Sequence, residues 1–212
     1  MKKSAIGYEF EHIQWYDFFN AYEKGVQKME KHVQQFVQDL EFGDKQRRYD
    51  AFLQLMEITK EQVDWAYDVW ETLIHYLSHK DNHMRAIAAQ LLCQLAKSDR
   101  EKRIVQDFKH VLEVTKDKRF VTARHSLQSL WKIGLVGEEQ QSIVMEGLRA
   151  RYEECIHEKN TTLIRYDIIV SLKKWYDVKS DNKIKDLANT LIELEEDEKY
   201  QKKYRKEWRG LL

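Results

Sequence analysis

One helical pattern occurs four times in this chain of 212 residues. In each copy a first residue, usually arginine, is followed by a small or aliphatic residue three positions later. Leucine comes four positions after that, and a further apolar residue three positions later again. The copies begin at Arg48, Arg85, Phe120 and Arg165, at intervals of 37, 35 and 45 residues. Helical units that repeat at this spacing stack in chain order and bury their apolar flanks against each other. The sequence therefore predicts an all-α fold, a superhelical solenoid of about four hairpins.

Each copy of the pattern follows another amphipathic segment, which predicts the first helix of a hairpin. Apolar residues recur at i, i+4, i+7, i+8 and i+11 over residues 29–40 and again over residues 66–77. This spacing places them in one stripe along a helix. A glycine and an aspartate at 43–44 mark the turn between the two helices of the first hairpin. Thr59 and Gln62 have the spacing of a capping box and predict the start of the next hairpin.

The repeats extend over most of the chain, and we expect a single domain over residues 1–212. Ring side chains are frequent near the start, and residues 1–27 are predicted to form an aromatic N-terminal cap, because the first hairpin of a stack has an open apolar end. An aromatic binding platform is the alternative. Residues 28–176 hold the four hairpins. Residues 180–212 predict a C-terminal helix with a charged tail, which either caps the last hairpin or docks on a second chain.

The turn and second helix of each unit resemble those of HEAT-like repeat proteins. The resemblance rests on a turn aspartate or asparagine, an arginine and the apolar pattern that follows, and it is clearest in residues 81–92. It departs in the third unit, where Phe120 replaces the arginine, and in the first helices, which lack the proline common in the family. In HEAT-like proteins this arginine often pairs with a turn aspartate of the same or a neighbouring repeat. The resemblance therefore implies structural roles for Arg48, Arg85 and Arg165.

Composition limits the classes of partner and compartment. Lys and Arg number 36, as do Asp and Glu, so the formal net charge is zero. A dedicated nucleic-acid-binding domain usually has a basic excess, so the composition disfavours such a partner. The start of the chain does not have the pattern of a signal peptide, and no segment approaches the roughly 18 apolar residues of a membrane span. Cys93 and Cys155 lie in different predicted helices and indicate free thiols in a reducing compartment. We therefore expect a cytoplasmic protein without membrane contact.

Two groups of residues suggest chemistry without completing a site. His75, His79 and His83 follow each other at intervals of four, a spacing seen in zinc sites. A polar turn should end the helix before His83, and no glutamate lies between the histidines to act as a base. Cys93 and His125 occupy nearby positions of successive repeats, yet the frame does not place them as a nucleophile and its base. We therefore predict no metal, no cofactor and no catalytic residue.

A basic ridge is predicted along the turns between the helices of each hairpin. Lysines and arginines recur there, and a ridge of this kind is able to follow phosphate groups. Neighbouring acidic residues dilute the charge, and solvated turn lysines are the simpler interpretation. The ridge consists of Lys45, Arg47, Lys80, Lys116, Lys118, Arg119 and Lys159.

The surface expected to bind a partner is the outward stripe of the second helices, which line the concave side in HEAT-like stacks. This stripe changes from acidic in the first repeat to basic in the last, and it mixes polar with aliphatic residues, which suits a protein or peptide ligand. It has no converging acid and base. The leading hypothesis is therefore a non-catalytic adaptor or scaffold protein. The predicted partner-binding residues are Asp50, Glu57, Gln90, Gln94, His125, Ser129 and Lys174.

Two other functions are compatible with the repeats. Alkylpurine DNA glycosylases of the HEAT-like class share this size and repeat type, and they use a basic concave groove with aromatic residues and an aspartate. Residues 63–70 are similar to their Trp/Asp segment, which implies a DNA-binding module of DNA alkylation repair. The other alternative is a subunit that forms homo-oligomers through its terminal helices, either at the aromatic N-terminus or through the stripe of Tyr200, Tyr204 and Trp208.

Overall fold

The computed structural model describes residues 29–212, which contain ten α-helices and no strand. The all-α class that the repeat predicts is confirmed for this part of the chain. The aromatic cap expected at residues 1–27 lies outside the described residues. The chain divides into two compact units, Met1–Ala51 and Phe52–Leu212. Over residues 29–212, none of the helices combines the length and the apolar character that crossing a bilayer requires.

The described part of the first unit is a helical turn motif. The turn begins where the Asp44 carboxylate caps the second helix by accepting hydrogen bonds from the backbone N–H groups of Arg47 and Gln46, both at 3.0 Å. The bond from Arg47 is the main reason why the pKa of Asp44 lies below its usual value. The Arg48 guanidinium returns to the first helix and donates to the Leu40 carbonyl oxygen at 3.0 Å. The two helices are α2 (Lys31–Phe42) and the first half of α3 (Lys45–Ile58).

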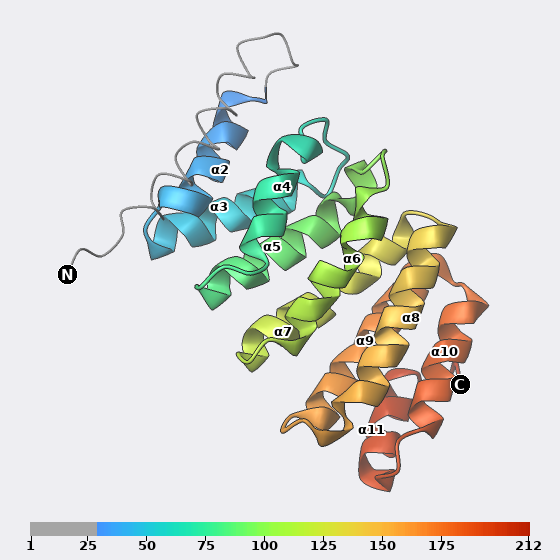
Figure 1. Ribbon diagram of the computed structural model, residues 1–212. Helices are drawn as coiled ribbons and strands as arrows, with labels where there is room; N and C mark the ends of the chain where they lie inside the picture. The colour runs from blue at the N-terminus through green and yellow to red at the C-terminus, as the bar shows by residue number, and fades with distance from the viewer. Residues whose placement is uncertain (1–28) are drawn as a thin grey trace, which may run out of the picture. The chain divides into compact units, whose positions relative to one another are not determined.

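The second unit contains the end of α3 and eight further helices, whose chain order is shown in Figure 1. They are α4 (Ala66–Tyr76), α5 (Asn82–Leu95), α6 (Arg103–Glu113), α7 (Phe120–Leu127), α8 (Glu138–Glu154), α9 (Thr161–Lys179), α10 (Asn182–Glu193) and α11 (Glu198–Glu207). Short 3₁₀ turns follow four of these helices: η1 (Ala96–Ser98), η2 (Val114–Lys116), η3 (Leu130–Leu135) and η4 (Cys155–His157).

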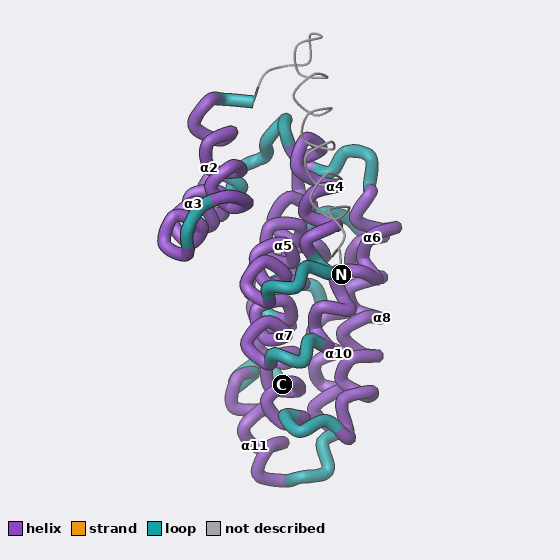
Figure 2. The backbone as a smooth tube through the Cα atoms, turned by 60° about the vertical axis from the view of Figure 1, so that its left-hand side comes forward, coloured by secondary structure: helices purple, strands orange, loops and turns teal. Residues whose placement is uncertain are grey.

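The helices of the second unit lie in two layers. Figure 2 shows α4, α6, α8 and α10 in one layer, with α5, α7 and α11 in the other. Within the layers α6 contacts α8 and α8 contacts α10, while α5 contacts α7, α7 contacts α9 and α9 contacts α11. Across the layers α4 contacts α5, and α9 contacts both α8 and α10. We call α4, α6, α8 and α10 with η2 and η4 the first layer, and α5, α7, α9 and α11 with η1 and η3 the second layer.

The core of the second unit lies between these layers and uses the apolar positions of the repeat. Burial of this stripe removes apolar area from water on one face of every second helix, which is the main favourable contribution to packing. Ile58 is the one apolar position of the four copies that stays partly exposed. The second-unit positions that are buried are Leu55, Ala88, Leu92, Leu95, Ala123, Leu127, Leu130, Ile168, Leu172 and Trp175.

Arginines at the start of the second helices bridge successive hairpins. The Arg85 guanidinium donates to the His79 carbonyl oxygen of its own hairpin at 2.6 Å and to the Asp117 carboxylate of the next at 3.0 Å. Arg165 donates to the Tyr152 carbonyl oxygen at 3.3 Å and pairs with Glu195 at 3.2 Å. Carbonyl groups at a helix end lack hydrogen-bond partners within the helix. Each arginine therefore donates to one such carbonyl group and at the same time links two hairpins.

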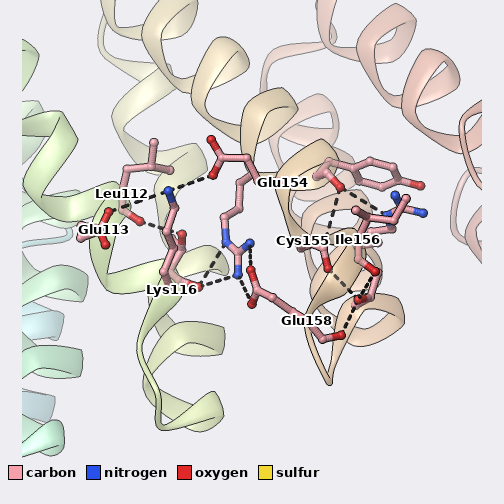
Figure 3. Close-up of polar contacts among 12 residues, drawn as sticks. Leu112, Glu113, Lys116, Glu154, Cys155, Ile156 and Glu158 are labelled. Atoms are coloured by element: carbon pink, nitrogen blue, oxygen red, sulfur yellow. Dashed lines mark hydrogen bonds and ion pairs between the residues drawn. The ribbon is translucent and has the colours of Figure 1, made fainter.

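In the third hairpin the carbonyl group at the end of the first helix is satisfied in another way, because the Phe120 side chain has no hydrogen-bond donor. Arg151 of α8 takes over, and its Nε and Nη2 donate to the Thr115 carbonyl oxygen at 3.3 and 3.2 Å. Its Nη1 and Nη2 also form a bidentate pair with Glu158 at 2.6 and 2.8 Å. Figure 3 shows these polar contacts, with Lys116 of the predicted turn ridge near Glu113 and Glu154. Lys116 pairs with Glu154 at 2.8 Å, so its charge is already neutralised.

Candidate functional site on the second layer

The structure exposes five of the seven residues that were predicted to contact a partner, at least in part. Asp50 lies in the first unit, where its carboxylate accepts a hydrogen bond from the Gln46 side chain. In the second unit, Glu57 forms an ion pair with Lys60 at 2.5 Å. The five residues are Asp50, Glu57, Gln90, His125 and Lys174.

The expected exposure is wrong for Gln94 and Ser129. Gln94 is 6% exposed and donates to the Thr59 carbonyl oxygen at 3.1 Å, because the loop after α3 lies over the end of α5. Ser129 is 5% exposed and donates to the His125 carbonyl oxygen at 2.9 Å. It lies at the joint between α7 and η3, where the helix that the pattern assumes is interrupted. Both side chains are satisfied inside the fold and do not face a partner.

A buried carboxylate joins α7 to α9 within the second layer. Asp167 is 1% exposed, and it accepts hydrogen bonds from Arg124 Nε at 3.2 Å and from Gln128 Nε2 at 3.1 Å. Burial raises the pKa of Asp167 despite these donors. Burial and the neighbouring Arg124 charge lower the pKa of His125. This cluster holds the two helices together, and its one acid is already engaged by two donors.

Three lysines gather on the same layer and form no ion pair within residues 29–212, although the charge of Lys174 acts on the buried Asp167 carboxylate. Lys132 is half-buried on η3, while Lys97 on η1 and Lys174 on α9 are exposed. Burial is the main cause that lowers the pKa of Lys132, and the charges of Lys97 and Lys174 lower it further. Within residues 29–212, no carboxylate forms an ion pair with the Lys132 ammonium, and the neighbouring Cys93 thiol is neutral because burial raises its pKa to about 12. We call Lys97, Lys132 and Lys174 the lysine cluster.

The sequence contains a signal for this cluster that the outward stripe missed. Lys60, Lys97 and Lys132 all stand 12 positions after the start of their copy of the repeat. Equal positions in successive repeats lie side by side in a stack, and the contact between the Lys97 ammonium and the Lys60 carbonyl oxygen has this relation. These lysines follow the regular helix, so a stripe drawn along the helix alone does not include them.

The two layers carry opposite charge although the whole chain is neutral. The first layer holds seven Lys and Arg against eleven Asp and Glu, a formal charge of −4. The second layer holds thirteen Lys and Arg against four Asp and Glu, a formal charge of +9. Charges collected on one face create a potential that selects partners of opposite sign and steers their approach. The cations that remain without an ion pair make the second layer suited to an acidic partner. Those that already form one are Arg85, Arg124, Arg165, Lys173, Lys202 and Arg205.

The residues that suggested metal or thiol chemistry do not form a site. Within residues 29–212, no three side chains of the His, Cys, Asp and Glu types are arranged to hold a metal ion. His79 instead accepts a hydrogen bond from the Asp81 backbone N–H at 3.0 Å. Cys93 is buried, and burial raises the pKa of its thiol to about 12. A thiol held in its neutral form is a poor nucleophile.

The aromatic segments that suggested DNA or self-association are largely internal. In residues 63–70, Trp70 is fully buried and its indole N–H donates to Asp107 at 2.9 Å. In the C-terminal stripe, Tyr204 and Trp208 are fully buried and donate to carbonyl oxygens of α9 at 3.0 and 3.3 Å. Both segments use their rings to join neighbouring helices, so Tyr204 and Trp208 are not available to a second chain.

Comparison with known proteins adds no assignment. No protein-family model matches this sequence, and no curated protein matches it significantly.

Proposed function

We propose that this chain is a HEAT-like α-solenoid that binds an acidic protein segment on the exposed face of its second layer and performs no catalysis. The order of helix contacts within each layer, the burial of the repeated apolar positions and the arginines that bridge successive hairpins support the solenoid. In this proposal the second layer is the concave side, and α10 and α11 cap the C-terminal end.

The observation that carries the proposal is the separation of charge between the layers. A neutral chain with a random distribution would give neither layer a strong preference for one sign. Here the second layer carries +9 and includes three lysines, Lys97, Lys132 and Lys174, that form no ion pair within residues 29–212. Folding brings these like charges together at a cost in free energy, and an acidic partner would offset that cost on binding.

Apolar side chains among the cations favour a protein over a nucleic acid. Val121 of α7 and Val178 of α9 are each 62% exposed, and Leu135 of η3 is 37% exposed. Protein interfaces combine such aliphatic groups with a polar rim. A phosphodiester backbone would contact the lysines and leave these aliphatic groups without a role. The preferred partner is therefore a segment that alternates acidic and apolar residues.

Fluorescence anisotropy with a labelled peptide of alternating glutamate and leucine tests the proposal. The double variant Lys97→Glu/Lys174→Glu should weaken binding by about tenfold or more, because it reverses two charges of the proposed site. Lys109→Glu/Lys183→Glu is the matched control, since it makes the same change in net charge on exposed residues of the first layer. Equal losses in the two variants would show that only total charge matters and would refute the assignment of the face.

A DNA-binding HEAT-like module related to the alkylpurine DNA glycosylases is the second candidate, and the positive charge of the second layer is the observation in its favour. Neutralising phosphates releases counterions, so DNA affinity should fall steeply between about 50 and 200 mM salt. Duplex DNA added to the peptide complex separates the two candidates. Displacement of the peptide at lower concentrations of DNA than of unlabelled peptide would favour the nucleic-acid function over the protein-binding one.

A further inference from the structure

The lysine cluster is assembled by three separate elements of the second layer. The turn η3 contacts η1 on one side and α9 on the other. Lys132 on η3 therefore lies next to Lys97 on η1 and Lys174 on α9, and it is the only half-buried member of the three. The Lys97 ammonium is held in place by the Lys60 carbonyl oxygen. Three cationic groups from three successive repeats thus come within electrostatic range of one another.

Lys132 has no ion-pair partner among the described residues. Its backbone N–H donates to the Ser129 carbonyl oxygen at 3.1 Å, whereas its ammonium group forms no hydrogen bond or ion pair within residues 29–212. Lysines that lose part of their hydration are normally paired with an acid. The buried acid of this face, Asp167, already accepts hydrogen bonds from Arg124 and Gln128. Burial and the two neighbouring lysines lower the pKa of Lys132, in keeping with an excess of positive charge at this point.

We propose that Lys97, Lys132 and Lys174 together bind one phosphate monoester, carried by a phosphorylated serine or threonine of the acidic protein segment. This inference rests on the proposed function, because it names the group that the second layer recognises. A phosphate monoester carries nearly two negative charges at neutral pH and three strong acceptor oxygens. Three ammonium groups match that charge and that number of acceptors, and lysine binds phosphate as a compact point charge. A carboxylate or a phosphodiester offers a single charge and leaves the cluster under-neutralised.

A pair of fluorescein-labelled peptides provides the test. Both contain alternating glutamate and leucine with one central serine, which is phosphorylated in one peptide and free in the other. The wild-type chain should bind the phosphorylated peptide about tenfold more tightly than the free one, because charge-assisted hydrogen bonds form only with the phosphate. Lys132→Gln should reduce that preference to about twofold or less. Lys109→Gln on α6 should leave the preference intact, since Lys109 is exposed on the first layer.

The outcomes separate this inference from the proposed function. Equal affinity of wild type for the two peptides would overturn the phosphate site while the acidic-segment function stands. Absence of binding to either peptide would overturn both. Lys174→Gln provides a second variant at an exposed position if circular dichroism shows that Lys132→Gln is unfolded, and it should also reduce the preference.

Inorganic phosphate is a probe that does not depend on the peptide sequence. Titration of lysine side chains by NMR with carbon-13 at the ε position should show that phosphate raises the pKa of Lys132, because a bound dianion favours the charged form. The same shift at Lys109 would indicate screening by free ions and would count against a site. Absence of any shift at Lys132 would also overturn the inference.

Discussion

Gly134 is the position at which one added carbon should disturb the core most. It lies buried in η3, and a Cβ atom built there would lie within van der Waals distance of three ring carbons of Trp175, the farthest of which, Cε2, would be 2.7 Å away. Favourable carbon–carbon contacts lie at about 3.5–4.0 Å, so the overlap is close to 1 Å or more. Trp175 is fully buried, and its ring has no free volume into which it can turn. Gly134→Ala must therefore shift η3 or the indole.

The cost of that shift can be estimated from known core substitutions. Overpacking a core by small-to-large replacement costs roughly 1–3 kcal/mol, and the severe overlap with Trp175 places this case near the upper end. Replacing glycine by alanine within a helical segment returns about 0.5–1 kcal/mol. We expect Gly134→Ala to lower the free energy of unfolding by about 2 kcal/mol. For a chain of this length that corresponds to a fall in Tm of roughly 4–8 °C.

Urea denaturation followed by circular dichroism measures the loss, and two further variants identify its cause. Gly137→Ala is the matched control, because its Cβ would contact only the far end of the Gln140 side chain, and as a change at the N-cap of α8 it should cost no more than about 1 kcal/mol. Trp175→Phe removes the overlapping ring, so the double variant Gly134→Ala/Trp175→Phe should lose less than the sum of the single losses. A Gly134→Ala protein as stable as wild type, or strictly additive losses, would refute the reasoning about η3.

The remaining predictions concern buried polar groups. Burial alone would raise the pKa of Asp117, but hydrogen bonds led by that from Arg85 hold it below its usual value. The resulting stability is present at neutral pH and is lost as the pH falls below about 4; Asp117→Asn should therefore show a smaller loss of urea midpoint between neutral pH and pH ~3 than wild type, and an equal loss would contradict the assignment. The Cys93 thiol, with a pKa raised to about 12, should react with Ellman's reagent at mildly alkaline pH only at the rate of unfolding, and fast reaction of the folded chain would contradict its burial. Arg151→Met should lower stability by about 2–3 kcal/mol, because it leaves the Thr115 carbonyl oxygen without a donor; chemical denaturation measures this, and a loss below about 0.5 kcal/mol would mean that the bond is replaced by water.

Periodicity predicted the parts of the fold that depend on one helix face. Positions such as Ala88, Leu92 and Ile168 are buried because a repeat of 3.6 residues determines which side of a helix meets its neighbour. The α-helical period gave the wrong face for Ser129, because the second helix of the third hairpin ends at Leu127 and the chain continues as a 3₁₀ turn. A 3₁₀ turn has a different number of residues per turn, so the face assigned from the α-helical period is no longer the exposed one.

The candidate site was only partly predictable, since it depends on which helices share a layer. Total charge indicated no preference, because the +9 of the second layer is cancelled by the −4 of the first layer together with a net −5 in the rest of the chain. Lys97 and Lys132 occupy the same position in their copies of the repeat, which is visible in the sequence. The lack of an ion-pair partner for Lys132 within the described residues, however, depends on tertiary contacts between η1, η3 and α9. Burial of Gln94 likewise depends on where the loop after α3 lies, which local pattern does not specify.

The third hairpin shows that the repeats share a physical requirement, a donor for the carbonyl groups at a helix end, and that the residue type which supplies it differs. Phe120 breaks the arginine pattern, so the side chain at this position cannot donate to the end of the preceding helix as Arg85 does in the second hairpin. Buried backbone carbonyl groups need a donor, and the fold supplies one from Arg151 of the following helix, whose charge Glu158 balances. The donor lies on another helix, so the positions within the repeat do not predict which residue it is. A search for equivalent repeats should therefore ask which carbonyl group requires a partner and which nearby side chains are able to reach it, since the identity of the residue at the first position does not settle either question.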